Sequence, residues 1–366
     1  MHRHKRIILL PGDGIGPEVM RQAVKLLKAL EEPFDLTFDF EEALVGGASL
    51  EKHGVPLTAE TLEKCKSADA VLLGPVGAPV YDNNPEHLRP EQALVDLRSG
   101  LGAFCNIRST HLTNYLPNRL PPTSTIAKDV DFVVMQTLRN GYYYREYANK
   151  HAVWETHPKK SNFTRDEILR VALKAFALAR IRKRKLTAIS DLSTPTSSRF
   201  WRSIVEEVAA EYPDVRLNFL NRDDAVANLD NYPFDFDVIF SESRYAESLN
   251  KAAGKIVESK GMIASACLGD GVSIFQPVHR TEQKIVGKNL ANPIAMMNSV
   301  TLMLQYSFNM PLAARNVEEA ISVVLARGYH TIDMLVTNGV TVGTEELVQH
   351  VLDEVSHCLG APILTA

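Results

Sequence analysis

A glycine-rich turn near the amino terminus constrains the fold of this chain more than any other feature. The apolar run Ile7–Leu10 leads directly into Pro11–Glu18, which reads PGDGIGPE. The run is typical of a buried strand, and Pro17 suits a first helical turn, where its missing N–H would have no partner. Glycines between a strand and a helix allow close approach of a phosphate or cofactor, although plain turn chemistry is more common. The spacing is not that of the G-x-G-x-x-G dinucleotide fingerprint.

Apolar runs alternate with amphipathic stretches along the rest of the chain. Strands are expected near residues 7–10, 70–73, 132–135, 186–190 and 237–240, and helices near 18–31, 166–180, 199–211 and 317–327. Thr164 and Glu167 have the spacing of a capping box, which predicts a helix start. The alternation indicates an α/β fold. Residues 142–160 are aromatic, mixed in charge and without helical period, which predicts an extended arm or hairpin.

Composition limits the classes of function. The 366 residues suffice for two domains, and a net charge of −4 provides no field that would attract nucleic acid or an anionic membrane. The basic run 180–185 is therefore expected to be a solvated helix end. Four scattered cysteines without zinc spacing indicate reduced thiols in a cytoplasmic protein. No segment has the pattern of a signal peptide or the length of a transmembrane helix, so no membrane partner is expected.

Several motifs, in order along nearly the whole chain, resemble those of the β-decarboxylating dehydrogenases, the family of isocitrate and isopropylmalate dehydrogenases. They are GDGIGPE at 12–18, RPEQALVDLR at 89–98, NIR at 106–108, SRFWR at 198–202, PVH at 277–279 and ANP at 291–293. The RPEQ start and the pair Leu94/Val95 resemble the isopropylmalate branch. The resemblance implies two α/β domains sharing a central sheet. A cofactor domain would comprise 1–104 and 258–366, and a substrate and dimerisation domain would comprise 105–257, with an interlocking arm at 142–160.

The resemblance also implies a reaction. Family members oxidise a 2-hydroxy acid with NAD or NADP and then remove its β-carboxylate, with Mg²⁺ or Mn²⁺, in a homodimer whose subunits share the active sites. Such a dicarboxylate or tricarboxylate substrate needs fixed bidentate donors, and Arg98 and Arg108 match the carboxylate-binding arginines. Leu94 and Val95 match the pocket for the apolar substituent, or are ordinary helix core. Tyr143 matches the proton-donating tyrosine, or belongs to a plain aromatic cluster.

The resemblance further implies that residues from both chain ends surround the cofactor: Gly12, Asp13, Gly14, Ile15, His279, Lys284 and Asn292. Lys284 stands where NAD enzymes have an aspartate for the ribose 2′-OH and NADP enzymes have a lysine for the 2′-phosphate. It therefore favours NADP. Arg280 replaces a family glycine, and its side chain could fill the space of the cofactor. The alternative is that Arg280 and Lys284 are solvated loop charges.

The remaining catalytic positions depart from the family pattern. Gln136 replaces a third substrate-binding arginine, and Asp191 stands at the position of the catalytic lysine. The metal-binding aspartates correspond to Asp223, Glu247 and Lys251, so that one is retained, one is lengthened and one is reversed in charge. Since Asp191 and Lys251 change charge in opposite directions, our hypothesis is that they pair across the dimer and that Lys251 occupies the space of the metal.

Two functions are therefore compatible with the sequence. The first is an isopropylmalate dehydrogenase-like oxidoreductase that decarboxylates a malate-type 2-hydroxy acid. The alternative is a catalytically degenerate or repurposed paralogue that binds ligand without the metal-dependent reaction. It would explain why the substitutions gather on the chemistry while the scaffold motifs remain. Whether the chain is an active enzyme stays open at this point.

Overall fold

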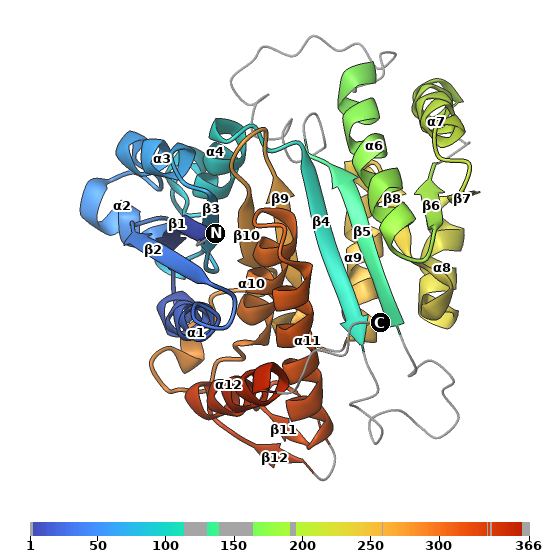
Figure 1. Cartoon of the computed structure of the whole chain (residues 1–366). Helices are drawn as coiled ribbons and strands as arrows, with labels where there is room; N and C mark the ends of the chain where they lie inside the picture. The colour runs from blue at the N-terminus through green and yellow to red at the C-terminus, as the bar shows by residue number, and fades with distance from the viewer. Residues whose placement is uncertain are drawn as a thin grey trace. The chain divides into compact units, whose positions relative to one another are not determined.

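The computed structural model describes residues 3–112, 130–138, 164–190, 195–257, 259–334, 336 and 339–360. They divide into two compact units, whose elements carry labels in Figure 1. The first unit contains residues 3–102 and 259–360, so it draws on two distant parts of the chain. The second unit contains residues 103–112 and 130–257.

The first unit has its strands in the order β2-β1-β3-β10-β9. Their bounds are β1 Arg3–Leu10, β2 Leu36–Glu42, β3 Ala70–Leu73, β9 Ala264–Leu268 and β10 Ile274–Pro277. Neighbours are parallel except β9, which is antiparallel to β10. Leu10 lies opposite Leu73, so the loops that follow β1 and β3 begin at the same edge of the sheet.

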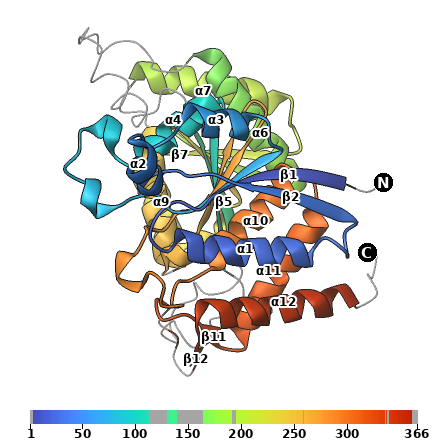
Figure 2. The same cartoon turned by 90° about the vertical axis from the view of Figure 1, so that its left-hand side faces the viewer.

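Helices cover both faces of these strands. Figure 2 shows α3 and α4 on one side of β1 and β2, and α1 on the other. The bounds are α1 Gly16–Ala29, α2 Gly47–His53, α3 Ala59–Lys66, α4 Gln92–Gly100, α10 Ile294–Tyr306, α11 Pro311–Ala326 and α12 Thr344–Gly360, with short strands β11 Tyr329–His330 and β12 Val340–Thr341. Periodicity did not predict α10, because this helix is apolar on all sides and buried against β9, β10, α1 and α11.

The second unit has its strands in the order β4-β5-β8-β6-β7. Their bounds are β4 Cys105–Leu112, β5 Val130–Thr137, β6 Lys185–Ile189, β7 Arg216–Leu220 and β8 Val238–Ser241. Only the β4–β5 pair is antiparallel among these neighbours in the described chain. In that pair Asn106 lies opposite Gln136, and Arg108 lies opposite Val134.

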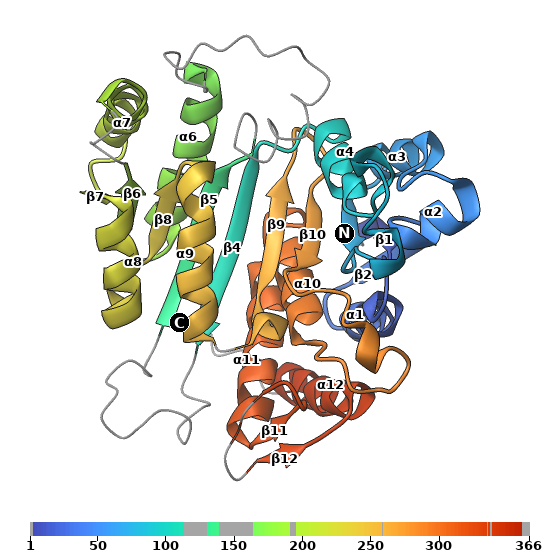
Figure 3. The same ribbon diagram turned by 180° about the vertical axis from the view of Figure 1, so that it is seen from behind.

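The helices of the second unit are α6 Arg165–Ile181, α7 Pro195–Ala210, α8 Arg222–Asn231 and α9 Ser243–Ile256. α6 lies in front of the strands in Figure 1, and α9 lies in front of them in Figure 3, so the two helices cover opposite faces. The capping box is confirmed: Thr164 accepts from the Glu167 N–H, and the Glu167 side chain accepts from the Thr164 N–H.

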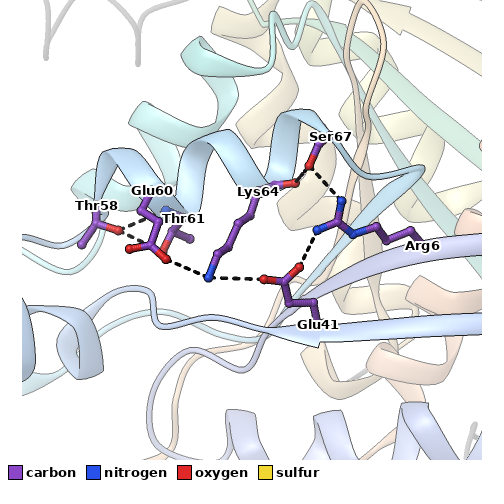
Figure 4. Close-up of polar contacts among 7 residues, drawn as sticks. All are labelled: Arg6, Glu41, Thr58, Glu60, Thr61, Lys64 and Ser67. Carbon is purple, nitrogen blue, oxygen red and sulfur yellow. Dashed lines mark hydrogen bonds and ion pairs between the residues drawn. The ribbon is translucent and has the colours of Figure 1, made fainter.

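A chain of ion pairs joins β1, β2 and α3 on the surface of the first unit (Figure 4). Glu41 accepts from Arg6 at 2.5 Å and lies 3.3 Å from the Lys64 ammonium, which also pairs with Glu60 at 2.9 Å. Side-chain hydrogen bonds and ion pairs lower the pKa of Glu41 and Glu60 and raise that of Lys64. The network fixes α3 against the two strands.

The α/β fold expected from the sequence is confirmed, with helices and strands near the expected positions. Cys65, Cys105 and Cys267 are buried cysteines. Within the described part of the chain no helix is both long and apolar enough to cross a membrane. The expected arm at 142–160 lies outside the described residues.

Candidate active site

The glycine turn after β1 packs against two other loops of the first unit. The Asp13 N–H donates to the Pro75 carbonyl at 2.8 Å, and the Ile15 N–H donates to the Thr281 carbonyl at 3.0 Å. Gly12 and Gly14 have φ values of +75° and +58°. A Cβ on Gly12 would lie 2.3 Å from the Pro75 oxygen, and a Cβ on Gly14 would lie 2.2 Å from the Thr281 oxygen. These glycines are required because backbone meets backbone here.

The Asp13 side chain points into the protein and is 7% exposed. Its carboxylate accepts hydrogen bonds from the N–H groups of Gly47 at 2.9 Å, Ala48 at 3.0 Å and Gly77 at 2.8 Å. Gly47 and Ala48 form the first turn of α2, whose N-cap residue, Gly46, has no side chain with which to satisfy them. Asp13 thus caps α2 from another loop.

Asn292 precedes α10 and is held from several directions. Its Oδ1 accepts from the Ile294 N–H at 3.0 Å, and its Nδ2 donates to Asp333 at 3.1 Å. The preceding residue, Ala291, donates its N–H to buried Glu18 at 3.2 Å, and Glu18 also accepts from the Thr344 hydroxyl at 2.6 Å. These contacts tie α1, α10 and α12 to the segment that carries Asn292.

His279 presents a buried acceptor in the same unit. Its Nδ1 lies 2.9 Å from the Arg280 carbonyl, which can only accept, so Nδ1 carries the proton and Nε2 carries a lone pair. Nε2 is buried and has no hydrogen-bond partner among the described residues. Burial lowers the pKa of His279, more than the Arg280 carbonyl, Asp333 and Glu282 raise it. The ring is therefore neutral near pH 7 and offers an acceptor to a ligand.

The loop after His279 carries exposed charges. Arg280, Glu282 and Lys284 are all exposed, and Glu282 has a φ of +42°. The side chain of Arg280 is therefore accessible to solvent. Lys284 lies in a single turn of 3-10 helix at Gln283–Ile285, where its ammonium is accessible to a ligand.

Helix α4 presents one half-buried stripe. Ala93 and Leu97 are buried and anchor the helix, whereas Leu94, Val95 and Arg98 are half-buried. Leu94 and Arg98 are four residues apart and share a face. Leu94 and Val95 are thus less buried than the core residues of this helix, and this exposure favours a role at an accessible surface over one in the helix core.

Gln92 and Asp96 occupy a different face of α4, joined by a hydrogen bond of 2.7 Å. Burial raises the pKa of the Asp96 carboxyl, and this hydrogen bond opposes the shift.

In the second unit, Arg108 and Gln136 share one face of the β4–β5 pair. Side chains directly opposite each other in a sheet lie on the same face, as do side chains two residues apart on one strand. Because Asn106 lies opposite Gln136, Arg108 is the diagonal neighbour of Gln136. Both are half-buried. The arrangement places the cation of Arg108 on the same face as the neutral amides of Gln136 and Asn106.

Of the acidic residues expected to hold a metal, only Asp223 has a described side chain. The Asp223 side chain is 81% exposed and pairs with Arg222 at 2.8 Å. Lys251 is exposed on α9, and only the backbone of Glu247 is described, one turn earlier. Tyr143 and Asp191 lie outside the described residues. Over the described ranges, no three His, Cys, Asp or Glu side chains come together as a metal ion requires.

Sequence reasoning overlooked Glu242. This carboxylate directly follows β8 and is 2% exposed. In α/β proteins the carboxyl ends of parallel strands carry the functional residues, so an acidic residue directly after the run Val238–Ser241 was a usable signal.

Two arginines of the basic run at 180–185 form ion pairs within the second unit. Arg180 pairs with Asp214 at 2.7 Å, as an exposed pair. Arg182 is only 18% exposed and pairs with Asp237 at 2.7 Å and Asp131 at 2.8 Å. The expectation of a fully solvated run is wrong for Arg182, because its guanidinium compensates the buried Asp237 carboxylate.

Comparison with known proteins adds to this geometry. A family profile described as isocitrate/isopropylmalate dehydrogenase matches residues 6–351. The chain is 39% identical over 355 residues to a 3-isopropylmalate dehydrogenase of Oceanobacillus iheyensis, covering 96% of each chain. It is 38% identical over 361 residues to that of Aquifex aeolicus, covering 97% of this chain and 98% of the relative.

Solved structures agree. An isocitrate dehydrogenase from Methylococcus capsulatus has a TM-score of 0.79 at 26% identity, over 96% of this chain and 99% of its own. A β-decarboxylating dehydrogenase from Thermococcus kodakarensis also has a TM-score of 0.79 at 26% identity, over 99% of both chains.

Proposed function

Because the chain belongs to the isocitrate/isopropylmalate dehydrogenase family, we propose that it is an isopropylmalate dehydrogenase-like enzyme that oxidatively decarboxylates a malate-type 2-hydroxy acid. The observation that carries this proposal is the match to relatives named 3-isopropylmalate dehydrogenase over almost the entire chain. A catalytically degenerate ligand-binding paralogue is not favoured, since the relatives described above are named 3-isopropylmalate dehydrogenase.

On the substrate side, we assign carboxylate binding to Arg98 and Arg108. Each side chain is half-buried, and a guanidinium can hold a carboxylate through two parallel hydrogen bonds. Leu94, one helical turn before Arg98, and Val95 supply an apolar surface for the substituent of the hydroxy acid. Gln136 offers an amide beside Arg108, so this part of the site binds oxygen without a second positive charge.

On the cofactor side, we assign the first unit as the cofactor domain and the second as the substrate and dimerisation domain. The family uses NAD and a metal ion in general, and a dinucleotide held by these residues would supply the acceptor for the hydride of the hydroxy acid. The turn Gly12–Ile15 and Asn292 shape the site, and the unpartnered Nε2 of His279 accepts a hydrogen bond from the dinucleotide. The exposed ammonium of Lys284 favours a 2′-phosphate and hence NADP.

The proton-transfer residues are proposed from the resemblance. Tyr143 donates a proton to the enol that decarboxylation leaves, and Asp191 stands where the family has its catalytic lysine. Asp223 and Glu247 are the candidate ligands for Mg²⁺ or Mn²⁺, and Lys251 replaces the third ligand. We propose a homodimer with shared active sites, in which the segment at 142–160 interlocks the subunits.

Steady-state oxidation of 3-isopropylmalate tests this function, with NAD⁺ and NADP⁺ and with and without Mn²⁺. Turnover in the ordinary range of about 1–10³ s⁻¹ supports the assignment. Arg98→Gln should raise the KM for the hydroxy acid by about 10-fold or more, because a charge-assisted hydrogen bond is lost. Arg21→Gln removes an exposed arginine of α1 and is the matched control. A folded protein without turnover under any of these conditions contradicts the proposal.

A further inference from the structure

We propose that Asp13 is a positioning residue whose buried carboxylate holds three loops in the arrangement that binds the cofactor, and that Asp13 does not contact the cofactor. That these loops bind the cofactor rests on the proposed function, whereas the holding of the loops does not. The acidic residue of the glycine-rich turn then has a structural role, and its neighbours in the turn face the ligand.

The strand order places Asp13 between the loops that it holds. β1 lies between β2 and β3 in the sheet. Asp13 follows β1, Gly47 follows β2, and Gly77 follows β3. One carboxylate at the central strand can therefore reach the loops on both sides, although Gly47 and Gly77 are 34 and 64 residues away in sequence.

Both carboxylate oxygens are engaged. Oδ2 accepts from the N–H groups of Gly47 at 2.9 Å and Gly77 at 2.8 Å, and Oδ1 accepts from Ala48 at 3.0 Å. The walls of this cradle are glycine: a Cβ on Gly46 would lie 2.6 Å from Oδ2, and a Cβ on Gly47 would lie 2.9 Å from Oδ1. The three N–H groups therefore donate to Asp13, and the carboxylate has most of its acceptor capacity filled by the protein.

The backbone carries the constraint from Asp13 to the loop with His279. The Asp13 carbonyl accepts from the Gly16 N–H at 2.9 Å, which closes the turn around Ile15. The Ile15 N–H donates to the Thr281 carbonyl at 3.0 Å. Thr281 is 7% exposed and lies two residues after His279. Fixing the carboxylate therefore fixes the turn, and the turn fixes the segment that presents the free Nε2 of His279.

Substitutions separate the three hydrogen bonds from the volume of the side chain. Asn has nearly the same shape as Asp, but it has one acceptor oxygen and an NH₂ group that cannot accept. The Asn oxygen can keep the hydrogen bonds from the Gly47 and Gly77 N–H groups. The Ala48 N–H then loses its hydrogen-bond partner. Ala removes all three bonds. A buried donor without a partner is costly, so the loops should open more often in Asp13→Ala than in Asp13→Asn.

The experiment compares Asp13→Asn and Asp13→Ala with a matched control, Asp69→Asn. Asp69 accepts from the Arg6 N–H at 2.9 Å and from Lys5 at 3.1 Å, and it precedes β3, at the opposite edge of the same strands. Amide hydrogen exchange is measured for peptides covering 43–50, 74–79 and 279–284. The dissociation constants of NADH and NADPH are measured directly by fluorescence, and KM values for the cofactor and 3-isopropylmalate are measured in the same preparations.

Exchange in the three segments should accelerate about 10-fold or more in Asp13→Ala and less in Asp13→Asn, while Asp69→Asn leaves it unchanged. The dissociation constant of the dinucleotide should rise in the same order, by about 10-fold or more in Asp13→Ala. The KM for 3-isopropylmalate should change far less than that for the cofactor.

If Asp13→Ala does not fold, the exchange rates and the dinucleotide dissociation constants of Asp13→Asn, compared with those of wild type and Asp69→Asn, test the inference. Weakened dinucleotide binding with unchanged exchange in these segments would mean that Asp13 contacts the cofactor, and it would overturn the inference. Uniformly faster exchange across the first unit with unchanged binding would also overturn it. If the wild-type protein binds neither dinucleotide but the Asp13 variants still show exchange changes confined to these segments, the loop-holding role is upheld and the proposed function is refuted.

Discussion

Replacing Arg182 with methionine tests the buried ion pairs at the end of α6. The guanidinium donates to Asp237 at 2.7 Å and to Asp131 at 2.8 Å, and the Asp237 side chain is 0% exposed. Methionine keeps an apolar side chain of similar length but removes the charge. The Asp237 carboxylate then stays buried, with the Lys183 N–H still donating to it at 2.9 Å.

The structure sets the expected size of the effect. Removing one partner of a buried ion pair costs about 3–5 kcal/mol. Two features favour the lower end of that range. The Lys183 N–H still donates to Asp237, and the Asp131 side chain is 35% exposed, so water can solvate its carboxylate. We expect the free energy of unfolding of the second unit to fall by about 3 kcal/mol. Arg180→Met, which breaks the exposed pair with Asp214 on the same helix, should have a far smaller effect.

The free energy of unfolding of both variants is measured by urea unfolding. The transition is followed by the fluorescence of Trp201, which is buried in the second unit. The dependence on pH gives a second test. Burial acts to raise the pKa of Asp131, but His111 and Arg182 hold it below its usual value. A lowered carboxyl pKa adds stability above the unfolded-state pKa of about 3.9, and this stability is lost as the pH falls further. The gap between wild type and Arg182→Met should therefore narrow on acidification. Equal effects of Arg182→Met and Arg180→Met at neutral pH would refute the reasoning.

Three further outcomes are expected. Burial raises the pKa of Cys65 to about 12, so its thiol should react with a thiol-specific reagent near pH 8 only after unfolding, as a time course with and without urea shows. Lys64→Met removes the centre of the ion-pair chain with Glu41 (Figure 4) and should lower the Tm by an amount that shrinks with salt. A salt-independent difference would contradict this. Thr164→Ala should cost about 1 kcal/mol in urea unfolding by loss of the α6 N-cap, whereas Thr164→Ser should stay near wild type.

Local signals in the sequence predicted the parts of the fold that depend on local chemistry. β3 was expected at residues 70–73 and forms at Ala70–Leu73, because a short apolar run is buried on both faces of a parallel sheet. The start of α6 followed from the capping box at Thr164. α10 was not predicted, since a helix that is buried on every side has no amphipathic period to detect.

In the candidate site, too, the sequence predicted what depends on local motifs and did not predict what depends on contacts distant in sequence. Motifs were sufficient to select the glycine turn, α4 and the segment with Asn292. They were insufficient for Asp13, because its three partners come from loops that only the strand order brings together. From the sequence alone, an aspartate in a glycine-rich turn is expected to bind a ligand. Its structural role depends on N–H groups that are distant in the sequence. Glu242 was different, since its place directly after a buried strand was readable in the sequence.

The divided first unit has a consequence for the order of synthesis. β3 ends at Leu73, and the strand that pairs with it, β10, begins at Ile274. At the usual elongation rates of about 5–20 residues per second, the ribosome needs roughly 10–40 s to produce the intervening chain. The edge of β3 stays unpaired during that time, while the whole second unit emerges and has time to fold. A nascent chain at this stage would carry one folded unit and an unpaired sheet edge. Because an unpaired edge can pair with other chains, we expect chaperones to bind this intermediate.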